Sequence, residues 1–427
     1  MVADFFDTTI GDQITLQRGF DITRKVQQLG NVPVVSSSGI SSFHDSAKVK
    51  GPGVVLGRKG SLGTVFFIDT DFWPHDTTLW VKDFKSNDPH FVYYFFKEMS
   101  GELKKMDVGA ANPALNRNHV HPLRISWPQI DVQKSISSIL GNLDQKIDLN
   151  RQINTTLEAM AQALFKSWFV DFDPVIDNAL AAGNPIPEPF HARAEARKAL
   201  GDQRKPLPAA IQHQFPDRFV LTEEMGWVPE GWEIVPLMEF GRIVCGKTPS
   251  KSKSEYFGKD TPFIKIPDMH TSMFVVDPIE KLSELGASSQ AKKSVPRGSV
   301  CVSCIATVGK VVIASTESQT NQQINSVVPR AEYLTPYLYF YMLSLERLFH
   351  DLASGGSATL NMNTSTFSRV RVLKPCKVLL RFFGDSVQSQ FSKIEINQKE
   401  SMTLTKLRDT LLPKLLSGEL RIPEDEQ

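Results

Sequence analysis

The feature of this sequence that most constrains its fold is residues 130–169, where apolar residues recur in heptads. With Ile136 at heptad position a, the seam continues to Trp168 at position d. A helix of 40 residues spans roughly 60 Å, which is far longer than a small core can hide, so it should pair with another helix. The seam positions are Ile136, Leu140, Leu143, Ile147, Asn150, Asn154, Leu157, Ala161, Leu164 and Trp168.

The same pattern returns near the C-terminus. Asn150 corresponds to Asn397 (397 − 150 = 247), and at this offset Ile394, Leu404, Leu411 and Leu415 repeat the seam. An Asn in an apolar seam lowers stability but penalises any register that leaves its amide unpaired. We therefore expect two antiparallel helices whose register Asn150 and Asn397 fix. The alternative is that each helix simply caps its own domain.

The segments before the two helices also repeat. Short strand-like runs occupy 32–35, 53–68 and 77–81, and one helix is expected at 91–99. Gly63 corresponds to Gly309 (309 − 63 = 246), and the run from Phe91 corresponds to the run from Tyr337 at the same offset. The repeat also pairs Gly109 with Gly355 and, at an offset of 245, Asn116 with Asn361 and Asn118 with Asn363.

These repeats predict an α+β fold. Two mixed α/β domains with largely antiparallel sheets are joined by two long antiparallel coiled-coil helices, in a pseudo-twofold internal repeat. The segment between them is rich in Pro, Ala and charge, and we interpret it as a connector with a short exposed helix, parts of which the aromatics of PDRF and MGWVPEGW dock. The predicted parts are domain 1 (1–129), central helix (130–171), connector (172–228), domain 2 (229–385), C-terminal helix (386–420) and tail (421–427).

Composition limits the function. The 48 Lys and Arg residues almost balance the 47 Asp and Glu residues, so any basic surface for a nucleic acid must be local. No run approaches 18 apolar residues, and the four cysteines suit a reducing compartment. We expect a cytoplasmic protein.

Two similar but non-identical domains suit a target that has two different parts, one for each domain. On B-DNA, where one turn is about 34–36 Å, such domains would read an asymmetric bipartite site. Basic side chains would contact phosphates, while polar side chains in loops would read base edges; otherwise they are ordinary solvated charges and turns. The candidate DNA-binding residues are Ser37, Ser38, His44, Arg58, Lys59, Thr77, Asn116, Asn118, Lys247, Lys251, Lys253, Lys310, Gln322, Gln323, Asn361 and Asn363.

The combined motifs resemble one family, the DNA-specificity subunits of type I restriction-modification systems. The resemblance rests on VPVVSSSGI, GRKGSLG, FWPHDTTLW, LGNLDQKIDLNRQINTTLEAMAQALFKSWFVDFDPV, GKTPSKSKSEYFG and INQKESMTLTKLRDTLLPKLLSGEL, and it covers nearly the whole chain. It implies two target-recognition domains that read double-stranded DNA, and helices that dock modification subunits, two in number. It also implies restriction subunits as partners. The chain itself would be non-catalytic and bind no cofactor, since S-adenosylmethionine, ATP and Mg²⁺ would belong to the partner subunits.

The docking faces would be the helix sides turned away from the seam. They include Gln133, Lys134, Lys146, Arg151, Lys166, Lys393, Lys399, Lys406 and Arg408, which ordinary solvation would equally explain.

Three motifs point to other chemistry, and we set them aside. Gly241–Thr248 matches the phosphate-binding loop pattern, but Pro249 follows where a helix should begin. Asp88, Glu102 and Lys104 mimic a nuclease pattern that the second copy lacks. Cys301 and Cys304 have no further zinc ligands and should be buried thiols. A protein-binding scaffold without DNA affinity and a single-chain nuclease remain as alternatives.

Overall fold

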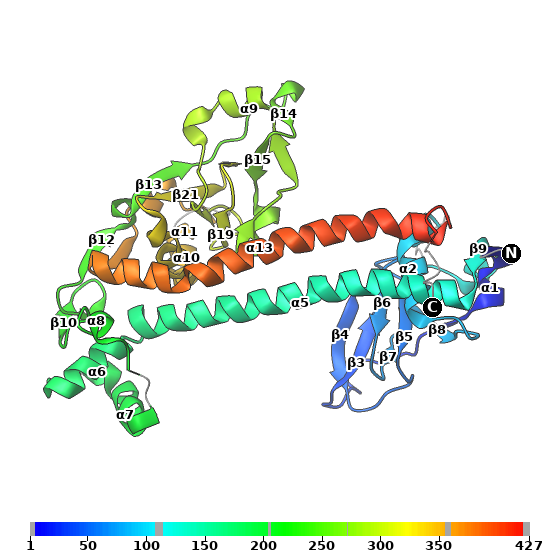
Figure 1. Cartoon of the computed structure of the whole chain (residues 1–427), viewed down its shortest axis with the longest axis horizontal. Helices are drawn as coiled ribbons and strands as arrows, with labels where there is room; N and C mark the ends of the chain where they lie inside the picture. The colour runs from blue at the N-terminus through cyan, green and yellow to red at the C-terminus, as the bar shows by residue number, and fades with distance from the viewer. Residues whose placement is uncertain (1–4, 107–113, 204–205, 271, 355–359, 422–427) are drawn as a thin grey trace. The chain divides into compact units, whose positions relative to one another are not determined.

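The computed structural model describes residues 5–106, 114–203, 206–270, 272–354 and 360–421. The chain divides into two units, one of Met1–Asp148 with Ser401–Gln427 (unit 1) and one of Leu149–Glu400 (unit 2). Two 40-residue helices, α5 (Ile130–Phe169) and α13 (Lys377–Leu416), each contribute to both units. Helices and sheets are both abundant, which confirms the α+β class (Figure 1).

Unit 1 contains two sheets beside its helices. The larger sheet has the order β2-β8-β5-β6 and is antiparallel throughout, while the smaller has the order β4-β3-β7 with β3 parallel to β7. A separate antiparallel pair joins β1 to β9. The bounds are β1 (Phe5–Thr9), α1 (Ile10–Gln13), β2 (Thr15–Arg18), β3 (Val32–Ser36), β4 (Gly39–His44), β5 (Gly53–Gly57), β6 (Val65–Ile68), β7 (Trp73–Pro74), β8 (Thr78–Asp83), α2 (Pro89–Glu98), α3 (Ser100–Lys105), α4 (Arg117–Val120) and β9 (Arg124–Pro128).

The core of unit 1 forms where helix α2 packs on the larger sheet and on the long helices. Asp88 caps α2 by accepting a hydrogen bond from the Phe91 amide at 2.7 Å, and Pro89 occupies the first turn, where proline is favourable. The apolar residues of α2 then bury against Trp127, Leu140 and Leu412. This packing fixes the sheet relative to the parts of α5 and α13 that belong to unit 1.

Unit 2 repeats this plan with additions. Its main sheet has the order β13-β21-β18-β19-β16, and a second sheet has the order β14-β17-β15-β20. The pair β12–β22 corresponds to β1–β9. The bounds are β12 (Glu233–Pro236), β13 (Gly241–Cys245), β14 (Phe257–Gly258), β15 (Thr261–Ile264), β16 (Phe274–Val275), β17 (Glu280–Leu282), α9 (Glu284–Ser288), β18 (Val300–Ser303), β19 (Val311–Ala314), β20 (Gln319–Thr320), β21 (Ile324–Pro329), α10 (Thr335–Ser344), α11 (Glu346–Ala353), α12 (Thr364–Ser368) and β22 (Arg371–Lys374).

The internal repeat is visible in equivalent backbone hydrogen bonds. In unit 1 the Arg58 amide donates to the Thr77 carbonyl at 2.9 Å, and in unit 2 the Cys304 amide donates to the Gln323 carbonyl at 2.8 Å. Both pairs differ by the predicted offset (304 − 58 = 246 and 323 − 77 = 246). The repeat is therefore a repeat of structure as well as of sequence.

The predicted pairing of Asn116 with Asn361 is wrong. The Leu115 amide donates to Arg58 in unit 1 as the Met362 amide donates to Cys304 in unit 2, each at 2.9 Å. Asn116 is thus equivalent to Asn363, and both cap a short helix. The offset has grown to 247 (363 − 116), since one extra residue separates this turn from the preceding repeat in unit 2. The predicted pair Gly109 and Gly355 lies outside the described residues.

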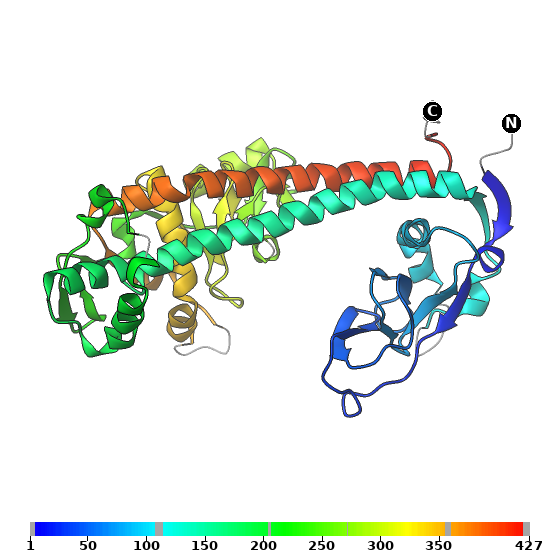
Figure 2. The same cartoon turned by 60° about the horizontal axis from the view of Figure 1, so that its bottom comes forward.

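Helices α5 and α13 lie side by side and antiparallel within each unit (Figures 1 and 2). In unit 2 Asn154 contacts Asn397, while Asn150 contacts Glu400 further along α13; in unit 1 Asp144 contacts Arg408. Every predicted seam position of α5 is at least partly buried. Helix α13 begins at Lys377 rather than at residue 386, because its first three turns already carry a buried face of Leu379, Leu380, Phe383 and Val387.

Residues 172–228 contain more secondary structure than a single exposed helix, all of it in unit 2. Phe172, Val175, Phe215 and Val228 join the main core of that unit. Asp173 accepts two hydrogen bonds of 2.7 Å from the Arg193 guanidinium, which fastens α7 to α6. The bounds are α6 (Asp173–Ala182), α7 (His191–Ala199), α8 (Ala209–Gln212), β10 (Phe219–Thr222) and β11 (Gly226–Pro229). In the described parts of the chain, every helix is too short or too polar to cross a membrane.

Candidate nucleic-acid interface

Three loops of unit 1 meet around Thr77, which precedes strand β8. The Thr77 carbonyl accepts hydrogen bonds from the amides of Arg58 and Lys59 at 2.9 and 3.0 Å. Its hydroxyl lies 3.3 Å from the Ser37 amide and 3.0 Å from Nδ1 of His75. The structure therefore brings together four candidate residues, Ser37, Arg58, Lys59 and Thr77, from separate parts of the sequence. We call this set the Thr77 cluster.

Two arginines and one carboxylate set the charge beside this cluster. Arg18 Nη2 lies 2.7 Å from Asp76 Oδ2, and Arg58 Nη1 lies 3.5 Å from the Asp76 carbonyl. Partial burial lowers the pKa of Arg58, and the neighbouring Arg18 lowers it further. Sequence reasoning named the loop that holds Asp76 but missed its role, which is to hold Arg18 next to Arg58.

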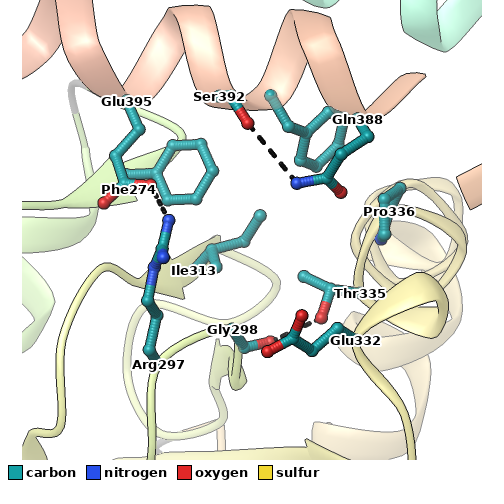
Figure 3. Close-up of a pocket in the computed structure, with 11 residues that line it drawn as sticks. Phe274, Arg297, Gly298, Ile313, Glu332, Thr335, Pro336, Gln388, Ser392 and Glu395 are labelled. Atoms are coloured by element: carbon teal, nitrogen blue, oxygen red, sulfur yellow. Dashed lines mark hydrogen bonds and ion pairs between the residues drawn. The ribbon is translucent and has the colours of Figure 1, made fainter. Parts of the chain in front are cut away.

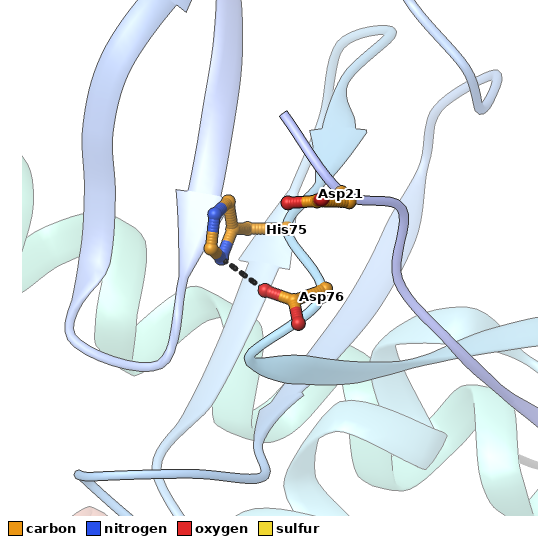
Figure 4. Close-up of side chains that lie close together, drawn as sticks. All are labelled: Asp21, His75 and Asp76. Carbon is orange, nitrogen blue, oxygen red and sulfur yellow. Dashed lines mark ion pairs between the residues drawn. The ribbon is translucent and has the colours of Figure 1, made fainter. Parts of the chain in front are cut away.

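Asp21, His75 and Asp76 form a group whose nitrogen and carboxylate atoms lie within 4.8 Å of one another (Figure 4). Such a group could hold a metal ion. However, Asp76 already pairs with Arg18 and lies 3.1 Å from His75 Nδ1, so its carboxylate is engaged by the protein. Its role in the structure is to order the loop before β8.

The other candidates in unit 1 differ in their surroundings. Ser38 is exposed, and its hydroxyl lies 3.1 Å from that of Ser36. His44 is buried, accepts a hydrogen bond from the Gln28 amide at 3.0 Å and packs edge-on against Trp73. Asn116 and Asn118 are exposed next to the Thr77 cluster, and the Asn116 side chain accepts a hydrogen bond from the Asn118 amide.

Unit 2 builds the equivalent loops from different side chains. The positions of Arg58, Lys59 and Thr77 are taken by Cys304, Ile305 and Gln323 (each offset by 246). Gln322 is exposed, and its Oε1 accepts a hydrogen bond from the Thr248 hydroxyl at 2.6 Å. The Lys247 amide donates to the Thr320 carbonyl at 2.9 Å, which places Lys247 beside Gln322.

The remaining candidates of unit 2 lie around these loops. Lys251 is exposed, and the Lys253 ammonium donates to the Tyr256 hydroxyl at 3.1 Å. Lys310 pairs with Glu346 at 3.4 Å, while Asn361 and Asn363 are exposed at the turn before α12. In unit 2 the cations thus come mainly from the loop after β13, not from the loop that carries Arg58 in unit 1.

A family model described as "Type I restriction modification DNA specificity domain" matches residues 7–159 and 229–376. The chain belongs to this family. It is 44% identical over 328 residues to the HindI specificity subunit of Haemophilus influenzae, covering 72% of this chain and 71% of that protein. It is 24% identical over 350 residues to the MjaIX specificity subunit of Methanocaldococcus jannaschii, covering 78% and 69%.

A solved structure supports the same fold. The type I restriction-modification S subunit from M. genitalium superposes with a TM-score of 0.61, covering 98% of this chain and 97% of that chain at 15% sequence identity. Members of the specificity family are non-catalytic DNA-recognition subunits, and the structure of the three motifs that suggested other chemistry agrees with such a role.

Residues from each of those three motifs serve the fold. The amides of Gly246 and Lys247 donate to backbone carbonyls of neighbouring segments, so they are not available to cradle a phosphate. Asp88 is the cap of α2 and also accepts a hydrogen bond from the Ser137 hydroxyl. Cys301 and Cys304 are buried thiols as predicted, and burial raises the pKa of each to about 11.

Two residues predicted for the outer helix faces are placed differently. Gln133 is buried, and its amide donates to Asn87 Oδ1 at 2.7 Å and to the Pro128 carbonyl at 2.9 Å. Arg408 reaches across to Asp144 at 2.5 Å instead of facing away from the other helix. Both predictions were wrong because the heptad pattern does not record which flanking positions touch the sheet domain or the neighbouring helix.

A small pocket in unit 2 marks where the sheet region meets α13 (Figure 3). Its volume is about 90 Å³, and Phe274, Arg297 and Glu395 are among its lining residues. Glu395 is almost fully buried and pairs with Arg297 at 2.5 Å and with Lys399 at 2.7 Å. Because a buried carboxylate is costly without partners, this ion pair fixes the Arg297 loop on the helix.

Proposed function

We propose that residues 1–129 (recognition domain 1) and 229–385 (recognition domain 2) each read one half of an asymmetric bipartite site in double-stranded DNA. One observation carries this proposal. The backbone hydrogen bonds around Thr77 and Gln323 are equivalent, while the side chains presented on them differ. One framework used twice with different donors and acceptors suits two different base sequences.

The candidates that are at least partly exposed divide by chemistry. Cationic side chains such as Arg58, Lys59 and Lys247 would contact phosphates and position the duplex, because these contacts carry no sequence information. Polar side chains that lie beside them would read base edges, among them Ser38, Thr77, Asn116, Gln322 and Asn363. His44 is the weakest candidate, since its ring already bonds to Gln28 and packs on Trp73.

Helices α5 and α13 would also carry the docking surfaces for modification subunits. The two helices have equal length and equivalent positions in the repeat, which favours two similar surfaces and hence two modification subunits. These subunits would supply S-adenosylmethionine chemistry, and restriction subunits would bring ATP and Mg²⁺. Lys134 and Lys393 are exposed members of the proposed docking faces.

Asn150 and Asn397 would set the helix register, although not by bonding to each other. Asn150 Nδ2 donates to Glu400 Oε2 at 2.8 Å, and Asn397 Nδ2 donates to Asn154 Oδ1 at 2.9 Å. A shift of either helix by one turn would break both bonds in a buried layer, which is costly.

The test is to co-express the chain with its modification subunit and to map methylated adenines across a genome. We expect one asymmetric motif of two half-sites with a fixed spacer. Replacing residues 1–129 with the corresponding domain of a relative should then change one half-site only. A stable complex that yields no motif, or a swap that alters both halves, would contradict the proposal.

A further inference from the structure

An exposed apolar patch surrounds strand β4 in recognition domain 1. Its members are Val26, Leu29, Ile40 and Phe43, and Ile40 and Phe43 each expose 55% of their surface. Among the described residues before helix α5, only Phe6 is another exposed large apolar side chain. Single exposed apolar residues are ordinary, but four on one strand and on the loop bonded to its end indicate a binding surface.

A β-bulge places Ile40 and Phe43 on the same face of the hairpin. Strand β4 is an edge strand paired antiparallel with β3, and Val35 pairs with Ile40 whereas Val34 pairs with Ser42. Ser41 is therefore the extra residue. In a regular strand, residues three apart point to opposite faces, so the bulge brings these two side chains together.

Both ends of β4 are tied to basic segments. At its start, the turn of Ser37 and Ser38 is held on the Thr77 cluster, which includes Arg58 and Lys59, by the Ser37 amide. At its end, the Gln28 amide donates to His44, which joins β4 to the loop that contains the exposed Arg24 and Lys25. The apolar patch thus lies between the proposed DNA-reading loops and the loop of Arg24 and Lys25, so it has cations on both sides; Asp45, which contacts His44, is the carboxylate at the second side.

We propose that β4 inserts Ile40 and Phe43 as a wedge between base pairs in or beside the half-site that recognition domain 1 reads. This inference rests on the proposed function. Apolar side chains that project from a basic surface can insert between two adjacent base pairs. There they replace the base stacking that the kinked duplex loses. The flanking cations favour this polyanionic target over an apolar protein surface.

The test uses the complex of the full chain with its modification subunit, bound to a duplex carrying the mapped motif. 2-Aminopurine is placed in turn at each position of the first half-site and its flanks, except at the methylated adenine, which is itself extruded for catalysis. We expect fluorescence to rise several-fold at one base step. The double variant Ile40→Ser/Phe43→Ser should lose this rise and bind the duplex about tenfold more weakly.

Leu221→Ser is the matched control, because Leu221 is at least as exposed as Ile40 and Phe43 but lies in the 172–228 segment, outside both recognition domains. It should keep both the fluorescence and the affinity. Since all three side chains are exposed, unchanged thermal unfolding should accompany every variant.

Four results would overturn the inference. Specific binding with no rise in fluorescence at any base step would exclude the wedge while leaving the proposed function intact. A rise that the double variant retains would do the same. A double variant that binds DNA normally but no longer co-purifies with the modification subunit would make this face a protein interface. If no motif exists at all, the proposed function fails, and the wedge fails with it.

Discussion

The side-chain amide of Asn397 in helix α13 donates a 2.9 Å hydrogen bond to the side-chain oxygen of Asn154 in helix α5. Asn397 is fully buried, and the two residues lie 243 positions apart in the sequence. This contact and the bond from Asn150 to Glu400 thus join the two halves of the internal repeat inside unit 2.

Replacing Asn397 with Ala should destabilise the protein. The Asn154 oxygen would lose its hydrogen-bond donor in an interface between helices that is partly shielded from water. Such a loss lowers the free energy of unfolding by about 1–3 kcal/mol. Urea denaturation of the purified protein measures the effect as a lower midpoint at constant slope. Lys393→Ala on the exposed side of the same helix should leave the midpoint unchanged, and an equal drop in both variants would rule out the loss of the Asn154 bond as the cause.

In unit 1 an ion pair joins the two long helices. Asp144 accepts a hydrogen bond from the Tyr94 hydroxyl at 2.8 Å and pairs with Arg408 at 2.5 Å, so one carboxylate links α2, α5 and α13. Burial and this carboxylate both raise the pKa of Tyr94. Asp144→Ala should cost about 1–3 kcal/mol because two partners lose their acceptor at a partly solvated site. Asp144→Asn, which keeps an acceptor, should lose less by the same denaturation assay; equal losses would rule out the hydrogen bonds as the cause.

The 172–228 segment should loosen at low pH through Asp173. Burial raises the pKa of this carboxyl, but hydrogen bonds from Arg193 and Ser167 outweigh burial and lower it below 3.8. A depressed pKa in the folded state contributes stability above the unfolded pKa, and this stability disappears as the pH falls through the folded value. Limited proteolysis between pH 5 and pH 2.5 with an acid-active protease should show cleavage in α6 or α7 rising at the acid end. In Asp173→Asn, cleavage in this segment should be faster than in the wild type at pH 5 and should change less with pH. If the variant kept the pH profile of the wild type, Asp173 would not be the titrating group.

Much of the fold follows from the sequence, because heptads and a constant offset are local or periodic signals. The seam of α5 and the equivalence of Gly63 with Gly309 needed no tertiary knowledge. The burial of Gln133 did need it, since that side chain is buried by Asn87 and Pro128 and not by the helix seam. The same holds for the site: Arg58 and Thr77 are both visible as loop residues, but only the hydrogen bond between them shows that they belong to one surface.

Arg58→Ala should weaken DNA binding without changing the recognised sequence. A residue that contacts a phosphate acts through counterion release, so the slope of log K against log salt should fall by about 1. Titration of the complex with motif-bearing and unrelated duplexes at several salt concentrations measures both effects. Lys374→Ala, whose ammonium pairs with Glu233 away from the reading loops, should change neither. If Arg58→Ala instead altered one base of the motif, Arg58 would be a base reader.

Gln322→Ala should relax one position in the second half-site only. Gln322 is exposed beside Lys247, and the Thr248 hydroxyl orients its amide by donating to Oε1. An oriented glutamine amide can accept from one edge atom of adenine and donate to another, which discriminates by about 1–3 kcal/mol. Because a loss of this size corresponds to at least a fivefold change in preference at that base, methylome mapping should show a degenerate position there while the first half-site and the spacer stay intact. Gln152→Ala, on the exposed face of α5, is the control and should leave the motif unchanged. A uniform drop in methylation at an unaltered motif would place Gln322 on the phosphate backbone, and degeneracy in the first half-site would refute the assignment of residues 229–385 to the second.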